Sequence, residues 1–92
     1  MAKATARTGM NAAVRTACDD MREMIKQEKN EIKRLKRLID SKTAELRKLQ
    51  GQKPPDKAAI QALKNMIAAL RKDLASRQEG LTGLEQVVSE NC

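Results

Sequence analysis

The side chains that could take part in chemistry are lysines and arginines repeated every seven residues, two cysteines, and a few charged residues set among apolar ones. Rows of cations attract anions such as phosphates or carboxylates. The two cysteines form no CxxC pair and have no histidine beside them, so they do not predict a metal site. The sequence therefore predicts recognition by charge, without a metal or another cofactor.

Catalysis is not expected from this set of residues. The chain has no histidine, so the commonest general base is missing. Its carboxylates are scattered among lysines and do not form a pair whose pKa values could be separated. A nucleophile would have to be Cys18, Cys92 or a serine, with no imidazole to activate it. We predict that the chain is not an enzyme.

A helical hairpin is the element that must position these residues. Two apolar repeats are interrupted by the segment 51–56, in which Pro54 and Pro55 cannot continue a helix and Gly51 suits a left-handed helix end. We predict an all-α fold with two long helices in an antiparallel coiled-coil hairpin. The expected parts are a basic N-terminal arm over 1–10, a helix over 11–50, a turn over 51–54 and a helix over 55–90.

Local details of the second helix follow from the same residues. Pro54 and Pro55 are expected at its cap and first position, with Asp56 in the first turn, where a carboxylate complements the helix dipole. Gly80 and Gly83 each cost a helix interior about 1 kcal/mol relative to alanine. We therefore expect the segment after Glu79 to be the weakest part of this helix and to bend or fray there.

The core of the hairpin is predicted from apolar residues spaced alternately by three and four, which are the a and d positions of a heptad. The predicted core residues are Ile25, Ile32, Leu35, Ile39, Leu46, Ile60, Leu63, Ile67, Leu70, Leu74 and Leu81.

Charged residues and a cysteine also occupy core positions. Glu28 and Arg77 both lie at d positions. Once the chain folds back, they should lie within about one layer of core side chains of each other. We therefore predict a partly buried ion pair that fixes how the two helices align. Cys18 lies at a and is expected to be a small core residue. Cys92 is terminal and could join Cys18 of the same hairpin or another Cys92. The two cysteines fit no disulfide framework, and the sequence leaves open whether either of them forms a disulfide.

The e positions of the repeat predict a cationic edge with two facing rows of positive charge. These residues are Arg15, Arg22, Lys29, Lys36, Lys57, Lys64 and Arg71. One interpretation is that the long side chains extend into solvent and cover apolar surface with their stems. The other is that the edge binds an anion or an acidic partner.

The opposite edge, formed by the g positions, is largely small or apolar. Its candidate interface residues are Met24, Leu38, Ala59, Met66 and Val87. An apolar face widened in this way is typical of helix bundles. We predict that this edge docks a second copy, so that two hairpins form a homodimeric four-helix bundle.

These features favour a structural or adaptor protein that acts by self-assembly and by interaction with a protein partner, which the sequence does not identify. The alternative is binding to nucleic acid without sequence readout, through the basic edge and the arm. Against it, the chain has no aromatic residue for base stacking and no zinc-finger spacing. No signal peptide or membrane span is recognisable, so we expect a cytoplasmic protein without a membrane partner.

A further alternative comes from a resemblance. A helical hairpin whose turn reads Pro-Asp-Lys, at residues 55–57, is similar to type III secretion needle subunits and their small helical chaperones. The resemblance implies a small subunit or chaperone of a secretion apparatus or virion. It covers the architecture and the turn. The lysine-rich first helix and the lack of tyrosine depart from needle subunits, so no residue role is carried over.

Overall fold

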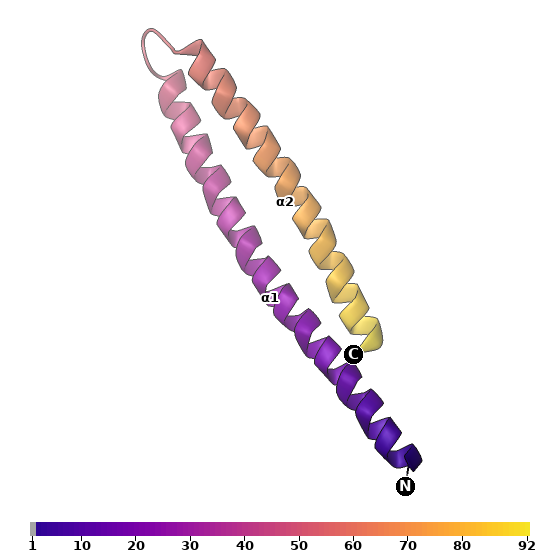
Figure 1. Ribbon diagram of the computed structural model, residues 1–92. Coiled ribbons are helices and arrows are strands. Elements are labelled where there is room, and N and C mark those ends of the chain that lie inside the picture. Colours follow the sequence, from indigo (N-terminus) through magenta and orange to yellow (C-terminus); the bar gives the residue numbers. More distant parts are fainter. Residues whose placement is uncertain (1) are drawn as a thin grey trace.

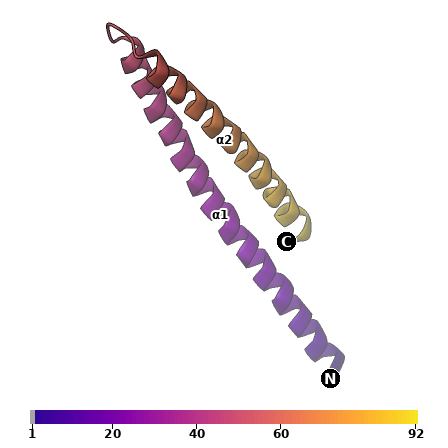
Figure 2. The same ribbon diagram turned by 45° about the horizontal axis from the view of Figure 1, so that its top comes forward.

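The computed structural model describes the backbone of residues 2–92 and the side chains from residue 13 onward. It contains two helices, α1 (Ala2–Gln50) and α2 (Lys57–Asn91), which pack antiparallel as a rod of 81 × 16 × 15 Å (Figures 1 and 2). The described residues form no strand. The all-α helical hairpin predicted from the sequence is therefore confirmed. No helix among the described residues is apolar enough over its length to cross a membrane.

The start of α1 differs from our expectation. The helix begins at Ala2 and not at residue 11, so the segment predicted as a separate arm is the first part of α1. Met1 lies outside the described residues. Alanine, lysine and arginine, which have high helix propensity, make up half of residues 1–10, and no proline is present to end the helix. α1 therefore extends past the end of α2 (Figure 1).

The first helix ends at Gln50 and a connection over 51–56 follows. The backbone N–H of Gly51 donates to the carbonyl oxygens of Arg47 at 3.1 Å and Lys48 at 3.2 Å, which satisfies the last turn. No described glycine has a positive φ. Our expectation that Gly51 adopts a left-handed conformation is therefore wrong, because these hydrogen bonds form without it.

The start of α2 also differs from the prediction, because both prolines lie in the connection. Asp56 is the N-cap, and its Oδ1 accepts a hydrogen bond from the backbone N–H of Ala59 at 3.0 Å. An aspartate can accept a bond from the otherwise unpaired N–H groups of the first turn, whereas a proline side chain cannot. This capping explains why the helix begins at Lys57 and not at residue 55.

The second helix runs without interruption through its two glycines to Asn91. A Cβ atom added at Gly80 or Gly83 would meet nothing within 4 Å, so neither glycine is required by packing inside the hairpin. The fraying that we expected at these glycines is absent among the described residues. Leu81 and Leu84 on either side of Gly83 are half-buried against α1, and this burial offsets the low helix propensity of glycine.

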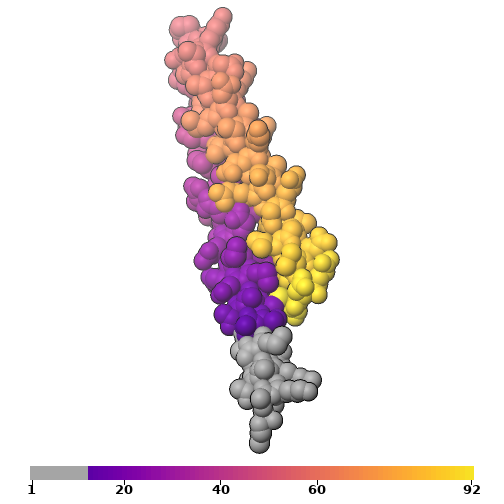
Figure 3. All heavy atoms as spheres, turned by 45° about the vertical axis from the view of Figure 1, so that its right-hand side comes forward, coloured from indigo at the N-terminus to yellow at the C-terminus, as the bar shows by residue number. Residues whose placement is uncertain are grey.

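The core lies along the line where the two helices meet, and the space-filling view shows them in contact along the rod (Figure 3). The buried residues are Cys18, Ile32, Leu35, Ile39, Leu63 and Ile67. The other core positions named from the sequence are half-buried, namely Ile25, Leu46, Ile60, Leu70, Leu74 and Leu81. Two helices alone cannot enclose an a/d stripe on every side, so even Leu35, the most buried of the described side chains, retains 2 % exposure.

A disulfide closes the open end of the hairpin. Cys18 and Cys92 are bonded, with their Cα atoms 6.0 Å apart and 74 residues of separation in the sequence. This distance is ordinary for a disulfide. The sequence left open whether Cys92 forms a disulfide and with which cysteine, and the structure has the bond to Cys18 within one chain. Cys18 is 5 % exposed, so it also fills the core position predicted for it.

Candidate interaction surfaces

The ion pair expected in the seam joins the two helices at mid-length. Arg77 donates from Nη1 to Glu28 Oε1 at 3.1 Å and from Nε to Asp73 Oδ2 at 3.4 Å. The pKa of Arg77 is raised above its ordinary value, chiefly because Glu28 accepts a hydrogen bond from the guanidinium. Both side chains are about one-third exposed, so the pair is only partly removed from water. It connects the core to the g edge through Asp73.

Lys42, the remaining charge at a core position, has a different partner. Its Nζ lies 3.3 Å from Glu45 Oε2, one turn along α1. The interaction stays within one helix, so it does not constrain how α1 and α2 align. Among the described residues, the two helices are linked by the Glu28–Arg77 pair, by the disulfide and by a longer ion pair between Lys29 and Glu85.

The g edge carries exposed apolar side chains. Met24 is 52 % exposed, Met66 46 % and Val87 43 %, whereas Leu38 and Ala59 are half-buried. Because α1 and α2 run antiparallel, Met24 and Val87 lie toward the disulfide end. The other three lie nearer the connection. We call the two groups the disulfide-end patch (Met24 and Val87) and the turn-end patch (Leu38, Ala59 and Met66).

Charged residues separate the two patches. Arg34 donates from Nε to both carboxylate oxygens of Glu31 at 3.1 Å. This hydrogen bonding lowers the pKa of Glu31, and the positive charge of Arg77 lowers it further. The same bond raises the pKa of Arg34, with a smaller effect from Asp73. We call Glu31, Arg34, Asp73 and Arg77 the middle charge cluster.

The cluster was not anticipated from the sequence. Glu31 and Asp73 occupy g positions of the heptad repeat, on the edge that the sequence predicts to be largely apolar. Their partners lie three or four residues away in the same helix, a spacing that favours ion pairs. That spacing was the signal that could have revealed the cluster.

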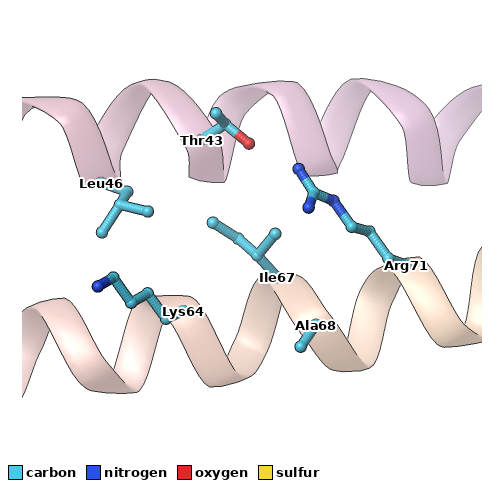
Figure 4. Close-up of a pocket in the computed structure, with 6 residues that line it drawn as sticks. All are labelled: Thr43, Leu46, Lys64, Ile67, Ala68 and Arg71. Carbon is cyan, nitrogen blue, oxygen red and sulfur yellow. The ribbon is translucent and has the colours of Figure 1, made fainter.

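The cationic edge differs from our expectation of two facing rows. The e-position cations of α2 lie in the half of that helix nearer the connection, whereas those of α1 lie mostly in the half nearer the disulfide. Because the helices are antiparallel, the two rows therefore lie end to end along the rod and do not face each other. Lys29 accordingly reaches Glu85 of α2, with Nζ and Oε2 3.9 Å apart. Lys64 lies across from Leu46, which is uncharged (Figure 4).

Part of this row is neutralised by the protein itself. Arg22 contacts Asp19 at 3.3 Å, and Lys29 has Glu85. The other cations of the edge have no carboxylate oxygen within 4 Å among the described residues. They are Arg15, Lys36, Lys57, Lys64 and Arg71.

Two of the unpaired cations border a hollow of about 180 Å³ between the helices (Figure 4). Its lining residues are Thr43 and Leu46 of α1 and Lys64, Ile67, Ala68 and Arg71 of α2. In Figure 4 the side chains of Lys64 and Arg71 extend toward α1 on either side of Ile67. The sequence named both cations but not the apolar residues between them, because the hollow depends on which residues face each other across the seam.

A metal centre is not found: the described residues contain no group of three or more His, Cys, Asp or Glu side chains arranged to hold an ion. Comparisons of the chain with protein-family models, with curated protein sequences and with solved structures found no match. The surfaces described above are therefore the basis for proposing a function.

Proposed function

We propose that this chain is a non-enzymatic structural or adaptor protein that acts by helix-to-helix recognition, first with a second copy of itself. The observation that carries the proposal is the exposure of Met24, Met66 and Val87 on one edge of the rod. Exposed apolar side chains gathered on one face are characteristic of interaction sites. A rod of two helices also has no further layer to cover this edge within one chain.

The charges on the same edge support a second copy as the partner. The middle charge cluster contains two carboxylates, Glu31 and Asp73, and two guanidinium groups, Arg34 and Arg77. Its net charge is zero, so two identical edges can meet without the repulsion expected between chains of net charge +7. The apolar patches on both sides of the cluster then provide buried contact in the four-helix bundle.

Light scattering after size-exclusion chromatography tests this proposal. We expect a dimer for the wild type, and a monomer for Met24→Glu combined with Met66→Glu, which places charge in both patches. The matched control is Ala44→Glu with Ala58→Glu, which makes the same change in net charge at exposed positions outside the patches. A wild-type monomer at about 100 μM, or equal dissociation of the control, would refute the proposal.

Nucleic-acid binding is the second candidate, and the unpaired cations Lys57, Lys64 and Arg71 favour it. Such binding would rest on phosphate contacts and weaken steeply with salt. The pairing of Arg22 with Asp19 and of Lys29 with Glu85 reduces the charge available. Filter binding on duplex DNA at two salt concentrations separates the candidates, because no retention at low salt dismisses this one.

The secretion-apparatus or virion alternative rests on the hairpin and its turn alone.

The disulfide bears on where the chain would work. We expected the cytoplasm, where thiols are kept reduced. There Cys92 would be a free thiol and the hairpin would be open at this end. The oxidised hairpin with its Cys18–Cys92 bond fits an oxidising compartment better.

A further inference from the structure

The hollow between the helices has an apolar floor. Ile67 is 5 % exposed, Leu46 is half-buried, and Ala68 offers only a methyl group. The hydroxyl proton of Thr43 is already donated to the carbonyl oxygen of Ile39 at 2.8 Å. The floor therefore offers no free hydrogen-bond donor. It is poorly suited to a phosphate, which is recognised by several convergent donors.

The rim of the hollow is cationic. Lys64 and Arg71 are two turns apart on α2, which corresponds to about 10 Å along the helix axis. Neither has a carboxylate partner among the described residues, and the same holds for Lys36 on the facing helix. Asp40, on the same helix as Lys36, forms no ion pair with any of them. These cations are therefore available to an external anion.

We propose that this groove binds an acidic amphipathic helix of a partner protein. An apolar side chain of that helix fills the hollow over Ile67, and carboxylates on either side of it pair with Lys64 and Arg71. Residues at i and i+7 of a helix lie on one face and are about 10 Å apart, which matches the two cations, and a residue at i+3 lies between them. The recognised pattern is Glu at i, Leu or a similar residue at i+3, and Glu at i+7.

This inference rests on the proposed role in protein–protein interaction and adds the second partner's chemistry and docking face. The face is the edge opposite the one proposed for the second copy, so a hairpin dimer keeps the groove open. A polyphosphate would match the charges but leave the apolar floor exposed to water. A neutral apolar helix would cover the floor but leave the cations unpaired.

Fluorescence anisotropy with a labelled 21-residue peptide tests the proposal. The peptide carries the Glu, Leu, Glu pattern in three successive heptads, and a second peptide replaces each leucine by serine while keeping its charge. We expect the leucine peptide to bind at least about tenfold more tightly, because burial of one leucine is sufficient for such a ratio. We also expect it to bind more tightly than a 20-nucleotide single strand of thymidines.

Variants of the full chain locate the site. Lys64→Glu with Arg71→Glu is expected to weaken peptide binding at least about tenfold. Lys48→Glu with Lys72→Glu makes the same change in net charge outside the hollow and is expected to change binding less than about threefold. Ala68→Glu places a carboxylate four residues from Lys64 and three from Arg71, so it should compete with the peptide without loss of helix.

Three results would overturn the inference. They are equal binding of the serine peptide, tighter binding of the thymidine strand, and no binding of the leucine peptide at about 50 mM salt. Light scattering on the same samples reports the dimer separately. A dimer that fails to bind the peptide refutes this inference alone, and a monomer that binds it refutes only the self-assembly proposal.

Discussion

Opening the disulfide is expected to be the most destabilising single chemical change that leaves the packing of the seam intact. The bond joins Cys18 near one end of the seam to Cys92 at the end of α2, across 74 residues. Reduction converts Cys18 into a buried thiol of nearly the same volume. The loss in free energy of unfolding therefore comes from the conformational entropy that the unfolded chain regains and from fraying of the last turn of α2.

The length of the loop closed by the disulfide sets the size of the expected loss of stability. The chain-entropy relation gives about 4.5 kcal/mol at 25 °C for a loop of this size, as an upper value. With an m value of about 2 kcal/mol/M, the midpoint of urea unfolding falls by about 2 M. This is a large fraction of the stability expected for a chain of 92 residues.

Urea titration followed by circular dichroism at 222 nm measures this shift. The protein concentration is held constant, because dimer formation would add to the measured stability. Cys92→Ser in the oxidised buffer should match the reduced wild type, since both lose only the crosslink. Cys18→Ala should be less stable than either, because it also removes a buried sulfur.

Two outcomes would refute this reasoning. One is an equal urea midpoint for the oxidised and reduced wild type. The other is peptide mapping of the oxidised protein that finds Cys92 bonded to Cys92 of another chain, because a bond between chains closes no loop within the hairpin.

Three further predictions concern single side chains. Arg77→Leu should retain helicity by circular dichroism but broaden the oligomer distribution in analytical ultracentrifugation, because Glu28 loses the partner that aligns the helices; one sharp species with unchanged stability would contradict this. Gly83→Ala should raise the free energy of unfolding by about 0.5–1 kcal/mol, since a methyl group meets open space there, and a loss of stability would indicate that another helix approaches this face. Glu31→Gln should lower the urea midpoint at pH 7. The pKa of Glu31 is lowered by Arg34 in the folded state, so this contribution is complete above the unfolded value of about 4.3 and is lost as pH falls through the folded pKa. A difference between variant and wild type that persists at the lowest pH would refute this assignment.

The proposed dimer and the proposed partner use opposite edges of one rod. Under these proposals, a patch that contains Met66 would face the second copy and the hollow beside Lys64 would face the acidic helix, although these residues are only two positions apart on α2. Such a separation lets the two interactions be altered independently by substitution. It also predicts that dimer variants keep their affinity for the peptide.

Much of the fold was predictable because it depends on local chemistry. Apolar residues at heptad spacing place Leu35 and Ile67 on the buried face of their helices whatever the rest of the chain does. Two adjacent prolines end a helix in any context. The helix boundaries were less predictable. They depended on Asp56 as a cap and on a helical start at Ala2, and these details compete at energies near 1 kcal/mol.

The sequence by itself determined that two amphipathic helices fold back on each other, and it identified Glu28 and Arg77 as partners, because periodicity and proline act locally. For the other positions, only the tertiary structure decided which residues face each other across the seam. That alignment joins Cys18 to Cys92, sets the cation rows end to end and forms the hollow between Lys64 and Arg71. A shift of one heptad would preserve the apolar pattern but change all of these pairs, and so the pattern alone could not select among them.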